Sequence, residues 1–171
     1  MNTRRVLVLF GTLLLLWAIV AQLNHSLTAL RVHLFAGALY VVSHALLHPV
    51  RTGLPVSLLG GLLCDATAPV MFGTHAILFI VAHAVVHHLR DRMPRDATAG
   101  RIVMVLFVNL GLFLALSFTQ IHRSPAPAAV WPRLLADLVW SQIFLSLITP
   151  WFFALQQRAL VLAGARRENP A

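Results

Sequence analysis

The chain has 171 residues, of which 59% are hydrophobic and only 11% are charged, and its mean hydropathy is +0.82. Soluble domains carry roughly a quarter of charged residues, so this composition excludes an ordinary water-facing surface. The net charge of +8 comes from 13 basic residues, all arginines, scattered between apolar runs, which fits contact with anionic lipid headgroups and argues against nucleic-acid binding.

The N-terminal segment superficially resembles a secretory signal peptide, because Arg4 and Arg5 precede an apolar run. That run, residues 6–23, is longer than the apolar core of a usual signal peptide, and no A-x-A cleavage site follows it. We therefore expect an uncleaved first transmembrane helix.

Further apolar stretches predict an all-α bundle of about six transmembrane helices that forms one integral membrane domain over residues 1–171. The helices expected after the first cover residues 32–47, 54–71, 74–89, 102–120 and 130–155. The stretch 54–71 contains two prolines, two adjacent glycines and an aspartate, so it either crosses as a broken helix or dips in and returns. Pro150 is expected to kink the last helix or to end it near Thr149.

The positions of the arginines distinguish these alternatives, because cytoplasmic loops are enriched in positive charge. If residues 54–71 cross the membrane, both termini lie on the side with most arginines, and the other side holds only Arg31, Arg123 and Arg133. If the stretch re-enters, the later loops exchange sides and most arginines lie outside. Six crossings with both termini cytoplasmic are therefore favoured.

Nine histidines are unusual for a chain of this size. His44 and His48 are four residues apart, as are His83 and His87, with His88 next door, so each pair lies on one helix face. These runs resemble two of the histidine boxes of membrane fatty-acid desaturases, but a third box is missing. We interpret the histidines as interfacial residues at cytoplasmic helix ends, and a metal-linked or pH-sensitive role stays open.

An aspartate and two glycines in the third apolar stretch form the first half of a candidate site. Asp65 lies in an otherwise apolar segment, where a carboxylate is costly in lipid, so it should face protein, water or a partner. Gly60 and Gly61 carry no side chains and therefore allow two helices to approach closely. The alternative is that Asp65 marks the outer end of a helix and has no partner.

The second half of the candidate site follows directly. Gly73 and Thr74 suit a tight turn and the start of the next helix, with Thr74 as a candidate N-cap. Asp65 and His75 would then lie near the same membrane face, where they can pair.

Other polar residues in the last two apolar stretches predict interhelical hydrogen bonds; they are Asn109, Ser117, Thr119, Asp137, Ser141 and Gln142. The single cysteine, Cys64, excludes an internal disulfide and a multi-cysteine metal site. The sequence contains no nucleophile with its base and orienting acid, no Walker loop and no dinucleotide fingerprint. It therefore indicates no catalytic residue, cofactor or metal ligand.

The candidate site resembles the central segment of the MreD family of rod shape-determining membrane proteins. In that family a Gly-Leu-x-x-Asp run, a loop and a Gly-x-His-Ala-like run join the third and fourth helices. The matching residues here are Leu59-Gly60-Gly61-Leu62-Leu63-Cys64-Asp65, a short turn with Pro69 and Phe72, and Gly73-Thr74-His75-Ala76-Ile77-Leu78. The length, the six expected helices, the arginine-rich fourth loop and the short basic tail also match.

The resemblance implies a non-enzymatic, cofactor-free scaffold of the peptidoglycan elongation complex in the bacterial cytoplasmic (inner) membrane. The implied partners are an MreC-like bitopic membrane protein and, through it, the MreB filament and the RodA and penicillin-binding synthases. The residues that match the family motif are implied in helix packing or partner binding; they are Gly60, Gly61, Asp65, Gly73 and His75.

Two other functions are considered. MreD proteins are similar in fold to the substrate-binding subunits of energy-coupling-factor vitamin transporters, so a transport role is the first alternative. It needs an enclosed polar pocket with aromatic side chains, whereas the chain has one tyrosine, Tyr40, and few polar groups in its apolar stretches. The second alternative is a histidine-ligated membrane metalloprotein.

Overall fold

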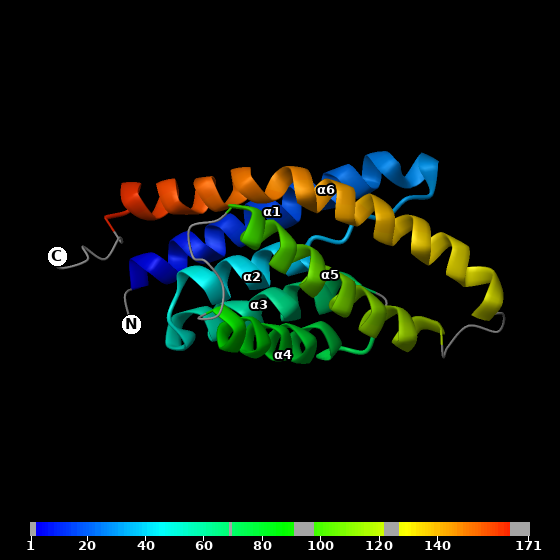
Figure 1. Ribbon diagram of the computed structural model, residues 1–171, viewed down its shortest axis with the longest axis horizontal. Coiled ribbons are helices and arrows are strands. Elements are labelled where there is room, and N and C mark those ends of the chain that lie inside the picture. Colours follow the sequence, from blue (N-terminus) through cyan, green and yellow to red (C-terminus); the bar gives the residue numbers. More distant parts are fainter. Residues whose placement is uncertain (1–2, 69, 91–97, 122–126, 165–171) are drawn as a thin grey trace.

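The computed structural model describes residues 3–68, 70–90, 98–121 and 127–164, and these form a helical bundle without strands (Figure 1). The predicted all-α fold class is confirmed. The elements are α1 (Thr3–Leu27), the 3-10 turn η1 (Thr28–Leu30), α2 (Gly37–Leu47), α3 (Val50–Thr67), α4 (Thr74–Leu89), α5 (Thr98–Ile121) and α6 (Pro127–Leu162).

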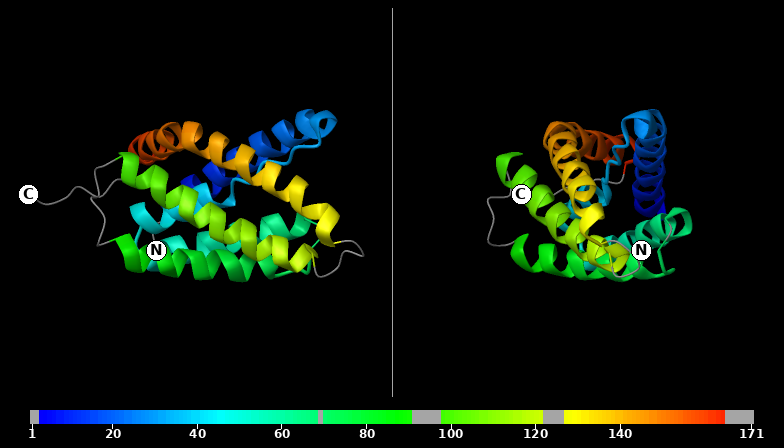
Figure 2. Two further views of the ribbon diagram at one scale, coloured as in Figure 1. Left: turned by 45° about the vertical axis from the view of Figure 1, so that its right-hand side comes forward. Right: turned by 90° about the vertical axis from the view of Figure 1, so that its right-hand side faces the viewer.

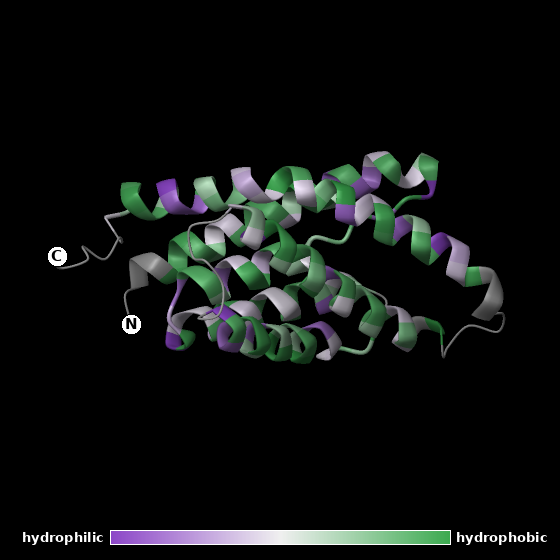
Figure 3. Ribbon diagram, in the orientation of Figure 1, coloured by the Kyte–Doolittle hydropathy of each residue, from purple (hydrophilic) through white to green (hydrophobic). Residues whose placement is uncertain are grey.

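Three of these helices are long and apolar enough to cross a membrane, over Val6–Leu30, Thr98–Thr119 and Val130–Leu162. Large apolar side chains on them face outward; Leu147 is 69% exposed and Trp151 is 76% exposed. Hydrophobic residues, drawn in green, make up most of the helices (Figure 3). The protein is therefore a membrane protein. α1 begins and α6 ends at the same end of the bundle (Figure 1), which agrees with an even number of crossings.

The number of crossings and their orientation remain predictions. Five of the arginines whose positions predict this orientation lie outside the described ranges; they are Arg92, Arg95, Arg123, Arg166 and Arg167.

α2 is the central helix of the bundle. Every residue from Ala38 to Ala45 is buried, and the helix contacts α3, α4, α5 and α6. Seen from one end, α1, α5, α6 and the α3–α4 pair surround this centre (Figure 2). A helix with apolar residues on all sides is typical of a buried core helix or of a membrane-spanning helix.

The expected second helix, 32–47, is wrong in its first part, because residues 31–36 are not helical and only Gly37–Leu47 forms α2. We call residues 31–36 the strap. Six non-helical residues reach up to about 20 Å, and a helix of 11 residues rises about 16 Å. A fully extended strap and the helix together would therefore be long enough for the roughly 30 Å of hydrocarbon in a bilayer.

Side chains of the neighbouring helices form hydrogen bonds with backbone groups of the strap. Asn24 of α1 both donates to the carbonyl oxygen of Leu34 (2.9 Å) and accepts from its N–H (2.7 Å). The N–H of His33 donates to Asp137 at 2.8 Å, and the N–H of Phe35 donates to Ser141 at 3.0 Å. Non-helical backbone at membrane depth requires such partners.

The expectation of a broken third helix at 54–71 is also wrong. α3 is continuous over 18 residues and ends at Thr67, four residues before the predicted end. Pro55 lies near the start of α3, where its missing N–H removes only a single hydrogen bond close to the helix end. Pro69 lies outside the described residues.

The remaining helices differ from expectation mainly at their ends. The fourth runs from Thr74 to Leu89, as predicted from 74–89, and α1 and α5 are longer than the predicted 6–23 and 102–120. α6 extends beyond the predicted 130–155 and continues through Pro132 and Pro150 to Leu162. Of the two alternatives for Pro150, an end of the helix near Thr149 is therefore wrong, and the kink stays a prediction.

A candidate site at the α3–α4 junction and the cavity beside it

Asp65, in the last turn of α3, caps the start of α4. Its Oδ2 accepts from the N–H of Gly73 (3.0 Å) and of Ala76 (3.2 Å), and its Oδ1 accepts from the N–H of His75 (2.9 Å). These N–H groups have no partner inside the helix, and a negative charge at a helix N-terminus is favourable. The carboxylate of one helix thus fastens the beginning of the next.

The prediction of Thr74 as N-cap is wrong. The N-cap position is occupied by Gly73 with φ 96°, a left-handed conformation that glycine adopts without strain, and it makes no side-chain cap bond. Thr74 instead donates its hydroxyl to the carbonyl oxygen of Met71 at 2.7 Å. The free N–H groups are instead capped by Asp65 of the preceding helix. Because this side chain lies eight or more residues upstream, it is not part of a local capping pattern in the sequence.

The predicted pair of Asp65 and His75 is confirmed, and the alternative of an unpartnered Asp65 is wrong. His75 Nδ1 lies 2.8 Å from Asp65 Oδ1, and both residues are only 5% exposed. Because an ionised carboxylate only accepts, Nδ1 carries the donated proton. In a neutral imidazole Nε2 is then an acceptor.

Gly60 and Gly61 allow α3 to approach two different helices. A Cβ at Gly61 would overlap the Cα of Ala76 and lie 2.7 Å from its nitrogen, so α4 backbone rests directly on this position. A Cβ at Gly60 would lie 2.6 Å from the ring of Tyr40 on α2. The candidate residues therefore pack helices of this chain against one another.

Two of the paired histidines, His44 on α2 and His83 on α4, are enclosed by the bundle. His44 and His83 are fully buried; His44 Nδ1 donates to the carbonyl oxygen of Tyr40, and His83 Nδ1 lies 2.9 Å from Ser57 Oγ. His44 and His83 therefore pack inside the bundle, whereas His88 is exposed. The interfacial position of these histidines stays a prediction. The described residues hold no group of three or more His, Cys, Asp or Glu that could bind a metal ion.

The predicted interhelical bonds are found in part. Gln142 donates from α6 to the carbonyl oxygen of Leu106 on α5 at 3.1 Å. Asp137 and Ser141 bond to the strap instead of a helix. Asn109 is buried, and its side chain has no hydrogen-bond partner among the described residues.

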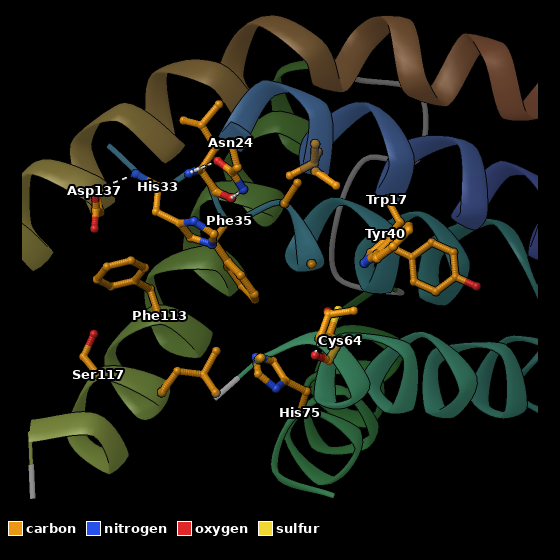
Figure 4. Close-up of a pocket in the computed structure, with 18 of the residues that line it drawn as sticks. Trp17, Asn24, His33, Phe35, Tyr40, Cys64, His75, Phe113, Ser117 and Asp137 are labelled. Atoms are coloured by element: carbon orange, nitrogen blue, oxygen red, sulfur yellow. Dashed lines mark hydrogen bonds between the residues drawn. The ribbon is translucent and has the colours of Figure 1, made fainter. Parts of the chain in front are cut away.

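A cavity of about 660 Å³ lies beside the α3–α4 junction (Figure 4). Its wall is formed by α1, the strap, α2, the last turn of α3, the first half of α4, α5 and the first half of α6. Sequence reasoning missed this cavity. The number of tyrosines did not predict an aromatic pocket, because most aromatic residues in the wall are tryptophan or phenylalanine. They also come from five separate segments; they are Trp17, Phe35, Tyr40, Phe79 and Phe113.

The Asn24 clamp on the strap gives a first testable prediction. Asn24→Ala leaves both backbone groups of Leu34 without partners, and each buried unpaired polar group costs about 1–3 kcal/mol. We expect the free energy of unfolding in mild detergent to fall by about 2 kcal/mol. Ser26→Ala is the control, because its exposed hydroxyl only bonds to its own helix at Gln22. Equal stability of the two variants would contradict the clamp.

Comparison with family models, with curated proteins and with solved structures gives no significant match.

Proposed function

We propose that this protein is a non-enzymatic scaffold of the MreD type, which acts in the peptidoglycan elongation complex of the bacterial cytoplasmic membrane and maintains rod cell shape. The proposal rests on the family motif in residues 59–78. The observation that carries it is the engagement of Asp65, whose carboxylate accepts all its hydrogen bonds from the turn and first residues of α4. A carboxylate satisfied in this way is a structural fastening and is a poor general base.

The chemistry around the motif supports the same reading. His75 Nδ1 is occupied by Asp65, and no hydrogen bond joins a described hydroxyl or thiol to the ring of His75. A nucleophile activated by an adjacent base is therefore not assembled among the described side chains of the site.

The expected partner is an MreC-like bitopic protein, which docks through its transmembrane helix; the MreB filament and the wall synthases are reached through it. Helices associate closely in lipid where side chains are small. On α1, Gly11 and Ala18 are both exposed, and a Cβ at Gly11 would have nothing within 4 Å. Gly11 is thus a point of close approach for a partner helix, and the exposed side chains of Leu7, Leu14 and Leu15 around it would pack against that helix.

The test is affinity purification of the tagged full chain from native membranes in mild detergent. We expect an MreC-like protein and wall synthases to be recovered. Gly11→Leu should lower that recovery about fivefold, equivalent to roughly 1 kcal/mol, at an unchanged membrane level.

The matched control is Gly111→Leu on α5, which is equally open and should not change recovery. Recovery of ATPase subunits in place of wall-synthesis proteins would favour the transport alternative. Recovery that neither glycine variant alters would place the partner on another face.

A further inference from the structure

The cavity beside the α3–α4 junction has walls suited to a flat ring. Trp17, Phe35 and Phe113 come from α1, the strap and α5 and lie around one space (Figure 4). Phe79 closes the wall beneath Gly37, where an added Cβ would lie 2.5 Å from the Phe79 ring. The volume of about 660 Å³ is within the range of small-molecule sites.

Two polar groups in the wall lack the partners that buried polar groups normally have. Ser117 is 3% exposed and makes no hydrogen bond with a described residue. His75 lines the same cavity; its Nδ1 is held by Asp65, so in the neutral ring Nε2 remains as an acceptor. An alkyl chain in the cavity would leave both groups unpaired, which is costly.

The polar residues at the strap side of the cavity differ in character from this wall. Arg133 is exposed, and Asp137 uses Oδ1 for the N–H of His33. His33, Arg133 and Asp137 all line the cavity. A ligand is thus offered aromatic faces, two hydrogen-bonding groups and a charged border, which is the combination typical of binding sites for small polar aromatic molecules.

We propose that this cavity binds a planar, fused heteroaromatic molecule carrying an N–H donor, held between the aromatic side chains and hydrogen-bonded by His75 and Ser117. This goes beyond the scaffold function and does not depend on it. The occupants that the proposal rejects are a lipid acyl chain and the transmembrane helix of a partner.

The test uses the fluorescence of Trp17 in the purified full chain. Replacing Trp131, Trp140 and Trp151 by Phe leaves Trp17 as the single reporter in the cavity wall. The probes are pterin and lumiflavin, which are fused heteroaromatic rings with an N–H donor, and 3-methyllumiflavin, which lacks the ring N3–H donor. A doxyl-labelled stearate serves as the acyl-chain probe.

We expect saturable quenching by pterin or lumiflavin. Ser117→Ala should weaken it about tenfold, the value of one hydrogen bond, and methylation of N3 should weaken lumiflavin binding similarly. Ala21→Phe places a ring at an exposed wall position of α1 and should abolish binding.

Two matched controls keep the result specific. Ala18→Phe lies three residues away on α1 and does not line the cavity, and Ser146→Ala removes an exposed hydroxyl of α6. Neither should change the affinity. Absence of saturable quenching by both rings, equal affinity in all four variants, or saturation by the stearate alone would overturn the proposal. Partner recovery from membranes is a separate measurement, so failure here leaves the scaffold proposal standing.

Discussion

Gly61→Ala should destabilise the bundle more than any other single methyl group added to a helical glycine. The new Cβ would overlap the Cα of Ala76, and the atoms it meets are α4 backbone, which cannot rotate away as a flexible side chain can. α3 and α4 must separate, and the Asp65 cap would separate with them. Overpacking of this kind costs about 1–3 kcal/mol, and we expect the upper end.

Thermal unfolding of the purified protein in mild detergent measures the effect. Gly111→Ala is the matched control, because it also lies inside a helix and a Cβ there would meet nothing within 4 Å. It should leave stability unchanged or raise it by up to about 1 kcal/mol, since alanine is the better helix former. A Gly61→Ala variant as stable as the control would show that α3 and α4 are not held at the described distance.

Binding of a partner should respond to Gly61 only through the fold. Gly61 is buried against α4, so Gly61→Leu should impair assembly by lowering the amount of folded protein. Gly11→Leu should impair assembly at a normal amount. The comparison of membrane level with recovery separates an internal packing residue from a residue on the proposed docking face.

The features that follow from local pattern were predictable from the sequence. Apolar stretches of sufficient length predicted the helices, and 74–89 matches α4 residue for residue. The cost of a carboxylate among apolar residues predicted that Asp65 has a partner. His75 was a reasonable choice, because it follows Asp65 by ten residues, across one short turn.

The features that were missed depend on contacts between distant segments. Most of the strap is apolar, so it resembles the start of a helix in sequence, but Asn24 and Asp137 supply its backbone partners from α1 and α6. Neither the residues of the strap nor those that line the cavity follow a periodic pattern along the chain. The burial of His83 between helices was also missed. It depends on Gly53 of α3, where a Cβ would lie 2.7 Å from the His83 ring.

Asp65→Ala should have the second large effect, and its size relative to His75→Ala reveals which bonds matter. Asp65→Ala removes the acceptor for three backbone N–H groups and for the imidazole, and loss of a buried charged partner costs about 3–5 kcal/mol. His75→Ala removes only the imidazole and leaves the backbone cap in place. It should cost about 1–2 kcal/mol.

The free energy of unfolding and the labelling rate of Cys64 by a thiol-reactive dye check this order, because Cys64 is free, partly buried and adjacent to Asp65. Thr67→Ala, an exposed hydroxyl bonded to its own helix, is the control and should change stability by less than about 0.5 kcal/mol. If the ion pair with His75 were the dominant contribution, Asp65→Ala and His75→Ala would cost the same. A larger loss for Asp65→Ala alone would identify the capping of α4 as the reason why the motif joins an aspartate at the end of one helix to the first turn of the next.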